Sequence, residues 1–256
     1  MGIVTLISDF GAYYPAVMKG IILDIAPEAT IIDVTHEISP QNVREAAFIL
    51  RETVKYFPRG TVHIAVVDPT VGTDRKSLVI EAGGHYLVGP DNGLLIPAAR
   101  SLGDFEVLRI EMGAKSNTFH GRDVFALVGA HIVTGRLQSL QPAPTYVDLL
   151  LQESHSSENA VSGTIFYVDR FGNCVTNIPG TLMIQHSGYS STHLLNGDTA
   201  IRFVQTYDEV AKGHPLLTVG GFDLVEIAVN TGSAATELNL KLGDRISLER
   251  PQPRSP

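Results

Sequence analysis

The 256-residue sequence has a single cysteine, Cys174, so it cannot form an intramolecular disulfide. Disulfides are rare in reducing compartments, and we therefore expect a cytoplasmic protein. Positive charge is also scarce, because 19 Lys and Arg stand against 27 Asp and Glu, for a formal net charge of −8. Nucleic-acid surfaces need clustered Lys and Arg, so nucleic acid is not an expected partner.

Long apolar runs are missing as well. The longest are far too short for a membrane-spanning helix, and residues 2–9 have neither the basic region nor the cleavage site of a signal peptide. We therefore expect no membrane association. A composition of 44% hydrophobic and 18% charged residues is typical of a globular chain with one large or two modest domains.

Several familiar ligand-binding motifs are also absent. Neither G-x-x-x-x-G-K-[ST] nor G-x-G-x-x-G occurs, which argues against nucleoside triphosphates and dinucleotides as ligands. The absence of G-x-S-x-G argues against a serine hydrolase. The nine histidines are scattered, without H-E-x-x-H or a Cys-His cluster, so the sequence predicts no metal site.

Strands and helices are predicted to alternate over the first part of the chain. Apolar runs predict strands at 3–7, 30–35, 62–67, 78–81, 86–88 and 107–110. Helical spacing of apolar residues predicts helices at 15–24, 41–56, 94–101 and 123–134. The alternation predicts an α/β domain over residues 1–150, with a mostly parallel sheet flanked by helices.

A polar linker is predicted at 151–160, and short strands separated by turns follow it. The predicted strands lie at 161–168, 174–178, 193–195, 200–203, 224–229 and 245–248. This pattern predicts a small all-β domain over 161–251, either a sandwich or a barrel.

The strand at 62–67 ends in a polar turn that runs from Asp68 to Arg75. All its residues except His63 are apolar, which is typical of a strand buried on both faces of a parallel sheet. Asp68 would then lie at the carboxyl end of the strand, where open α/β sheets bind ligands. Gly72 permits a tight bend, so Arg75 can fold back toward Asp68. The pair could form a functional polar site or a turn-stabilising ion pair.

Other polar residues beside glycines allow a simpler interpretation. His120 precedes Gly121 at the start of a predicted helix, and for a lone histidine a structural role is the simpler hypothesis. The same interpretation holds for His36 and His63. Cys174 is predicted to be a small buried hydrophobic residue.

In the second domain a turn from Asp169 to Asn173 is predicted between two strands. A hairpin accounts for its Gly172 and Asn173. Phe171 is less easily explained by a turn alone, because an exposed aromatic ring there would offer a flat surface to a base.

Seven motifs follow one another along the chain: Asp9-Phe10-Gly11, Ile32-Asp33-Val34-Thr35-His36, Val67-Asp68-Pro69 with Val71-Gly72-Thr73, Pro90-Asp91-Asn92-Gly93, Thr118-Phe119-His120-Gly121-Arg122-Asp123, Phe171-Gly172-Asn173 and Glu226-Ile227-Ala228-Val229-Asn230. Together they resemble the S-adenosyl-L-methionine hydrolase family, also called SAM hydroxide adenosyltransferases, which is related to fluorinase and chlorinase. The resemblance covers nearly the whole chain. It implies an α/β domain followed by a β-barrel, in a homotrimer whose active sites lie between the N-terminal domain of one subunit and the C-terminal domain of the next.

The resemblance also implies a reaction. Water or hydroxide attacks the 5′ carbon of the ribose of S-adenosyl-L-methionine and expels methionine, which leaves adenosine, and no metal or other cofactor is required. The family's polar triad matches Asp68, Arg75 and His120. Arg75 would stabilise negative charge on the water, Asp68 would orient the water and accept a proton, and His120 would complete the cluster.

Substrate-binding positions are implied in the same way. Asp9 matches the ligand of the ribose hydroxyls, and Phe171 and Asn173 match residues around the adenosine and methionine. Asp169 is placed to meet the methionine ammonium. The segment that borders the adenine contributes Glu226, Asn230 and Ser233.

This chain departs from the family pattern at three places. Phe222 lies in a segment where relatives commonly offer a serine to the methionine carboxylate. Thr70 stands where relatives often have glycine, and residues 12–14 replace a segment that often carries an acidic residue.

Two alternatives stay open. Halide-using relatives lack the Asp and Arg and have Tyr-Ser where this chain has His120-Gly121, so the triad favours hydrolysis over halide transfer. A non-catalytic sensor that only holds adenosine would not need Asp68 and Arg75 directed at the 5′ carbon.

Overall fold

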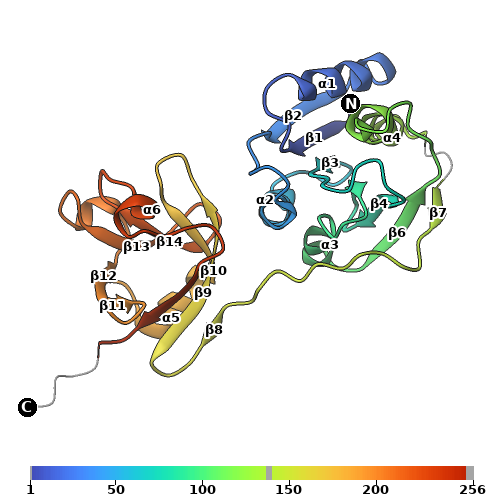
Figure 1. The fold of residues 1–256 in the computed structure, drawn as a ribbon. Coiled ribbons are helices and arrows are strands. Elements are labelled where there is room, and N and C mark those ends of the chain that lie inside the picture. Colours follow the sequence, from blue (N-terminus) through green and yellow to red (C-terminus); the bar gives the residue numbers. More distant parts are fainter. Residues whose placement is uncertain (1, 137–139, 252–256) are drawn as a thin grey trace, which may run out of the picture. The chain divides into compact units, whose positions relative to one another are not determined.

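The computed structural model describes residues 2–136 and 140–251. The chain groups into two compact units, Met1–Leu151 and Gln152–Pro256, which Figure 1 colours from blue to yellow-green and from yellow to red. The limits predicted for the two domains, 1–150 and 161–251, stay predictions. The predicted linker at 151–160 contains a short strand, β8 (His155–Ser156).

Within the described residues, the sheet of the first unit has seven strands in the order β2-β1-β3-β5-β4-β6-β7. Their bounds are β1 (Ile3–Ser8), β2 (Thr30–Thr35), β3 (Val62–Val66), β4 (Ser77–Ala82), β5 (His85–Pro90), β6 (Phe105–Ile110) and β7 (Leu140–Pro142). Strand β3 lies between β1 and β5, and all its residues are buried, as its apolar sequence predicts.

The sheet is mixed. The pairs β2–β1, β1–β3 and β3–β5 are parallel, whereas β5–β4, β4–β6 and β6–β7 are antiparallel. The α/β class is confirmed, and the antiparallel part arises because β4 and β5 are joined by the tight turn at Gly83-Gly84. A short turn can join only antiparallel neighbours.

Helices cover both faces of this sheet (Figure 1). The connections β1–α1–β2 and β2–α2–β3 run in opposite directions along the sheet, so right-handed crossovers place α1 (Tyr14–Ile25) and α2 (Val43–Val54) on opposite faces. Helix α1 packs against η1 (Gly121–Ala126), a π-helical segment, and α4 (Leu127–Val133), while α2 packs against α3 (Ile96–Leu102).

The second unit is a closed barrel. Its strands are β9 (Ala160–Val168), β10 (Cys174–Pro179), β11 (Thr192–Leu195), β12 (Thr199–Phe203), β13 (Pro215–Val219), β14 (Leu224–Val229) and β15 (Arg245–Glu249). They follow the order β10-β14-β13-β12-β11-β15-β9, and the additional pairing of β9 with β10 closes the ring. The prediction of a barrel is confirmed over that of a sandwich.

In the part of this unit that the structure describes, three short helical segments and two strands were not predicted from the sequence. They are α5 (Gly180–Ser187), η2 (Tyr207–Glu209), α6 (Ala234–Glu237), β8 and β13. Among the described residues, no helix is both long and apolar enough to cross a membrane.

Candidate active site

Asp9 and Asp68 follow β1 and β3, which are neighbouring parallel strands. The carboxyl ends of parallel strands meet at one edge of a sheet, so the two aspartates share the edge where ligands bind in α/β proteins. The turn after β3 is fixed by Gly72, whose backbone has φ +81°. A Cβ at this position would lie 2.7 Å from the carbonyl oxygen of Asn117, so only glycine fits here without a backbone shift.

The turn brings Arg75 back onto Asp68, as predicted. Arg75 Nε and Nη2 both donate to Asp68 Oδ2, at 2.8 and 2.5 Å. The two side chains are only 7% and 5% exposed. An ion pair that is nearly buried and joined by two hydrogen bonds is more stable than an exposed ion pair of the kind that only stabilises a turn.

His120 completes this cluster from η1. Its Nδ1 lies 2.7 Å from Arg75 Nη2 and must accept the hydrogen bond, because a guanidinium only donates. The imidazole is therefore neutral, with its proton on Nε2. Burial and the neighbouring charge of Arg75 lower the pKa of His120 and outweigh the raising effect of Asp68.

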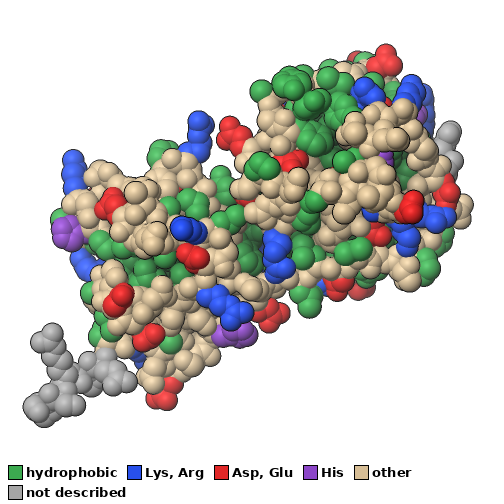
Figure 2. Space-filling model, in the orientation of Figure 1, with side chains coloured by type: hydrophobic (Ala, Val, Ile, Leu, Met, Phe, Trp, Pro, Cys, Tyr) green, Lys and Arg blue, Asp and Glu red, His purple; other side chains and the backbone are tan. Residues whose placement is uncertain are grey.

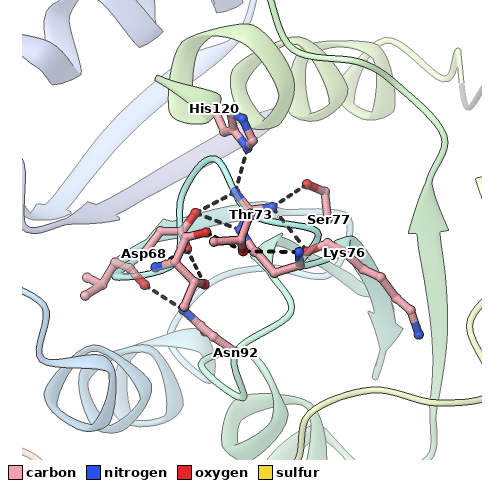
Figure 3. A network of polar contacts seen from close by, with 9 residues as sticks. Asp68, Thr73, Lys76, Ser77, Asn92 and His120 are labelled. Atoms are coloured by element: carbon pink, nitrogen blue, oxygen red, sulfur yellow. Dashed lines mark hydrogen bonds and ion pairs between the residues drawn. The ribbon is translucent and has the colours of Figure 1, made fainter. Parts of the chain in front are cut away.

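Every donor of the Arg75 guanidinium is engaged. Besides Asp68 and His120, its Nη1 donates to the carbonyl oxygen of Lys76 at 3.2 Å and to Ser77 Oγ at 2.9 Å. Figure 3 shows Asp68, Ser77 and His120 converging on this network. The guanidinium also lies 5.4 Å from the ring centre of Phe125. The five N–H groups of arginine thus have partners, and the charge is fixed in one place.

The acceptors of Asp68 are filled in a similar way. Its Oδ1 accepts from Thr70 N at 3.3 Å and from Thr70 Oγ1 at 3.1 Å. These contacts are longer than the two from Arg75, so the Thr70 hydroxyl is the partner most easily exchanged. Thr70 was noted in the sequence only as a departure from the family pattern, and Ser77 was not singled out.

The motif at 90–93 supports the cluster rather than joining it. Asn92 Nδ2 donates to the carbonyl oxygen of Val67 at 2.8 Å and so fastens the chain just before Asp68 (Figure 3). Asp91 Oδ1 accepts from Val147 N at 2.7 Å.

A cavity of about 520 Å³ adjoins the cluster. Arg75 and His120 form part of its wall, together with Ser77, Arg109 and Glu111. The cavity therefore reaches the cluster at Arg75 and His120, whereas Asp68 is not part of its wall.

Asp9 has a hydrogen-bond partner outside this cluster. Its Oδ2 accepts from Gln41 N at 2.9 Å. Within the described residues its Oδ1 accepts no hydrogen bond, so one carboxylate oxygen stays available to a ligand. Gln41 has φ 64°, an uncommon conformation for a residue other than glycine, which directs its N–H at the carboxylate.

An aromatic cluster lies beside Asp9 and His120. The rings of Phe10 and Phe119 are 5.8 Å apart, and Tyr14 packs against both at 6.1 and 5.1 Å. Tyr13 packs on Tyr14 and is exposed. Figure 2 shows hydrophobic side chains gathered on this face near α1.

In the second unit the turn between β9 and β10 holds three of the predicted residues. Asp169 Oδ1 accepts from Phe171 N at 2.8 Å and Asn173 N at 2.9 Å, and its Oδ2 accepts from Asn173 Nδ2 at 2.9 Å. Phe171 is 78% exposed, as predicted. Gly172 packs directly on Ser233, because a Cβ there would lie 2.0 Å from Ser233 Oγ. The structure thus brings this turn and Ser233 together.

The remaining predicted residues have structural partners. Ser233 caps α6 through Thr236 N, and Asn230 Nδ2 donates to the carbonyl oxygen of Val210 at 2.8 Å. Phe222 is half-buried in the turn between β13 and β14. These contacts leave the predicted binding roles untested.

Glu226 is buried in the barrel. It accepts a hydrogen bond from the hydroxyl of Tyr207 at 2.5 Å. Burial raises the pKa of Glu226 and outweighs the lowering effect of that bond. No signal in the sequence pointed to Tyr207.

Other histidines and the cysteine have structural environments, as predicted. His63 Nδ1 pairs with Thr5 Oγ1 at 2.8 Å, and burial lowers the pKa of His63 to about 3. Cys174 is buried, which raises the pKa of its thiol to about 11. Among the residues described by the structure, no group of three or more His, Cys, Asp or Glu side chains could hold a metal ion.

The fold and the site define a class: an α/β unit with an Asp–Arg–His cluster at the ligand-binding edge of its sheet, followed by a closed barrel. Two family models match the chain, the SAM hydroxide adenosyltransferase N-terminal domain over residues 4–141 and the C-terminal domain over residues 163–247. The chain belongs to the SAM hydroxide adenosyltransferase family.

Individual relatives agree with this assignment. A (R)-S-adenosyl-L-methionine hydrolase of Methanocaldococcus jannaschii is 35% identical, over 97% of this chain and 96% of the relative. A fluorinase of Actinoplanes sp. is more distant, at 26% identity over 97% of each chain. The crystal structure of an uncharacterized conserved protein from Thermotoga maritima matches with a TM-score of 0.90 at 34% identity, covering 96% of this chain and 100% of that one.

Proposed function

We propose that this protein is an enzyme that hydrolyses S-adenosyl-L-methionine to adenosine and L-methionine. The observation that carries the proposal is the buried Asp68–Arg75–His120 cluster at the ligand-binding edge of the sheet. The relatives named (R)-S-adenosyl-L-methionine hydrolase support the same reaction over nearly the full length of the chain.

The chemistry balances without a cofactor. The oxygen of water forms a bond to the 5′ carbon as the bond from that carbon to sulfur breaks. The electron pair of the broken bond stays on sulfur, so the sulfonium becomes the neutral thioether of methionine, and the water loses one proton. Water has a pKa of about 15.7, so a group that stabilises hydroxide character lowers the barrier.

Arg75 is the group we assign to that stabilisation. Its guanidinium is fixed by five hydrogen bonds, so it does not have to reorganise as charge develops on the nucleophile. The water would reach Asp68 Oδ1 by replacing the Thr70 hydroxyl, whose 3.1 Å contact is among the weakest in the cluster.

Asp68 and His120 then have distinct roles. Asp68 would orient the water and take its proton, a transfer favoured as the water oxygen loses electron density to carbon. His120, neutral and bonded through Nδ1, would hold Arg75 on the side opposite Asp68 and leave its Nε2–H for a second contact to the nucleophile.

Substrate binding involves both units in this proposal. Asp9 would accept the ribose hydroxyls through its open Oδ1, and Phe171, at 78% exposure, offers its face to the adenine. Asp169 and Asn173 would meet the methionine end, Phe222 would border the carboxylate, and the adenine edge would meet the segment with Glu226, Asn230 and Ser233.

We further propose a homotrimer with active sites at its subunit interfaces, acting in the cytoplasm. Large apolar side chains exposed in the single chain support an assembly, among them Tyr13 and Leu150 in the first unit and Phe171 in the second. The single, buried Cys174 is in keeping with a reducing compartment. Sedimentation of the purified protein tests the trimer.

Halide transfer is the second candidate, because fluorinases are among the relatives. One observation argues against it. A serine at position 121, the residue of halide-using relatives, would place its Cβ 2.9 Å from the ring of Phe10 and 3.2 Å from Met18 Sδ. The packing around Gly121 therefore fits the hydrolase form of this position.

The test is incubation of the purified protein with S-adenosyl-L-methionine, with and without chloride or fluoride, followed by chromatography of the nucleosides. Adenosine and methionine in equal amounts, unaffected by halide, are expected. A halogenated adenosine would establish halide transfer instead. Bound adenosine without turnover would identify a sensor.

A further inference from the structure

The motif Ile32-Asp33-Val34-Thr35-His36 has no part in the cluster, yet its last residue contacts the segment that carries Asp9. Ser8 Oγ and His36 Nδ1 are 2.8 Å apart. Ser8 is buried and precedes Asp9 directly. Its hydroxyl oxygen also accepts from Phe10 N at 3.3 Å, so its proton is free to point at His36.

Backbone bonds join the same two segments. Gly11 N donates to the carbonyl oxygen of His36 at 3.1 Å, and Ile38 N donates to that of Ser8 at 3.4 Å. Gln41 N donates to the carboxylate of Asp9. Hydrogen bonds therefore join residues 8–11 to residues 36–41, and we call these two segments the clasp. Asp9 lies in the first segment and His36 begins the second.

The far side of the imidazole is anchored as well. His36 Nε2 lies 3.0 Å from Asp33 Oδ1, and Lys19 pairs with Asp33 Oδ2. Burial raises the pKa of Asp33, but the contacts with Lys19 and His36 outweigh this effect. The pKa is lowered overall, so Asp33 stays ionised. The carboxylate of Asp33 thus lies on one side of the imidazole and the Ser8 hydroxyl on the other, so the ring is fixed from both sides.

We propose that His36 is a positioning residue for substrate binding: through Ser8 and the clasp it holds Asp9 in the orientation that accepts the ribose hydroxyls. This inference rests on the proposed function, from which the role of Asp9 comes. His36 touches neither the reacting atoms nor the Asp68–Arg75–His120 cluster. Its loss should therefore weaken the grip on ribose and leave the chemical step intact.

The variants are His36→Ala, which removes both side-chain contacts, and His36→Asn, which keeps a polar group near the Nδ1 position. His36→Ala should raise KM for S-adenosyl-L-methionine about tenfold, the effect of one lost buried hydrogen bond, with kcat within about threefold of wild type. His36→Asn should recover most of the loss. The matched control is His193→Asn in the barrel, where His193 pairs with Ser191 Oγ at 3.0 Å; its KM should equal that of wild type.

A second measurement separates positioning from general destabilisation. Calorimetric binding of adenosine should weaken about tenfold in His36→Ala, whereas binding of 2′,3′-dideoxyadenosine, which lacks the ribose hydroxyls, should not change. The effects of Asp9→Asn and His36→Ala should not add, because both act on one contact. Ser8→Ala removes the same bond with little loss of volume and should repeat the result if His36→Ala fails to fold.

An unchanged KM in folded His36→Ala, or an equal loss of affinity for both nucleosides, would overturn the proposal. Failure of the proposed function gives a different result, since wild-type protein would then produce no adenosine from S-adenosyl-L-methionine.

Discussion

Two turns in this molecule begin in the same way and serve different ends. Asp68 and Asp169 each follow a strand, each accept a hydrogen bond at Oδ1 from the backbone N–H two residues later, and each precede a glycine with φ +81°. Such Asx turns need no partner outside the turn. The second oxygen of Asp68, however, binds Arg75, whereas that of Asp169 binds the amide of Asn173 inside its own turn.

The two turns differ in what the second carboxylate oxygen binds. Around Asp68 a charge from seven residues away is buried and saturated with hydrogen bonds, which suits stabilisation of a transition state. Around Asp169 the turn closes on itself and presents Phe171 to solvent, which suits recognition. We therefore expect changes in the first turn to alter kcat and changes in the second to alter KM.

The largest effect is expected at the cluster. Asp68→Asn, Arg75→Met and His120→Ala should each lower kcat by about a thousandfold, the scale for loss of one preorganised stabilising group. Adenosine affinity should stay within about threefold of wild type, since the cluster faces the nucleophile. Single-turnover rates and calorimetry measure the two quantities, and wild-type rates in all three variants would refute these roles.

A smaller effect is expected in the second turn. Phe171→Ala should raise KM about tenfold or more with kcat little changed, because stacking of a base on an aromatic ring contributes about 1–3 kcal/mol. The melting temperature should not move, as the ring is already exposed. Ile184→Ala, another exposed apolar residue of this unit, is the control and should leave KM unchanged. A fall in kcat at constant KM would remove the contrast between the turns.

A weaker effect is expected for Thr70, whose hydroxyl occupies the place that we assign to water. Thr70→Ala keeps the backbone bond to Asp68 and loses only the 3.1 Å hydroxyl contact. Turnover should therefore stay within about threefold of wild type, since the lost bond is weak and must be exchanged during the reaction. A loss as large as that of Asp68→Asn would show that the hydroxyl acts directly on the nucleophile.

The smallest effect concerns pH. The Arg75–His120 bond requires an unprotonated Nδ1, and the lowered pKa of His120 keeps the ring neutral below the usual value of about 6.5. Less than half of kcat should therefore be lost on lowering the pH to 6.5. Stability must be followed in parallel. His63, with its pKa lowered to about 3, stays neutral in the fold while the unfolded chain binds protons below about pH 6.5, so stability falls toward acid.

Sequence reasoning reached the fold class and the Asp68–Arg75 pair because these depend on local signals, whereas the place of His120 in the cluster was implied only by the family resemblance. An apolar strand ending in Asp68, with Gly72 inside the turn, is enough to bring Arg75 back. What it missed depends on tertiary contacts. The π-helical start at Gly121 arises where α1 packs closely, and the strand β13 begins at Pro215, a residue that disfavours strands except at their ends.

The hydrogen-bond partners of two predicted substrate-binding residues, Glu226 and Asp169, were missed for the same reason. Tyr207 and Glu226 are 19 residues apart in the sequence, and no local pattern marks the hydrogen bond that joins them. Asp169 was predicted as a ligand for an ammonium group, but the spacing could not reveal that both its oxygens already accept bonds from the turn. Local chemistry identifies candidate groups, and only the packed structure shows which of their lone pairs remain open.

The close packing at Gly121 has a consequence for descent within the family. A single methylene at this position would press on Phe10 and Met18, at a cost of about 1–3 kcal/mol for overpacking a tight site. A serine at this position would therefore require the side chains of Phe10 and Met18 to shift, and substitutions that enlarge the space around Phe10 would make the exchange easier.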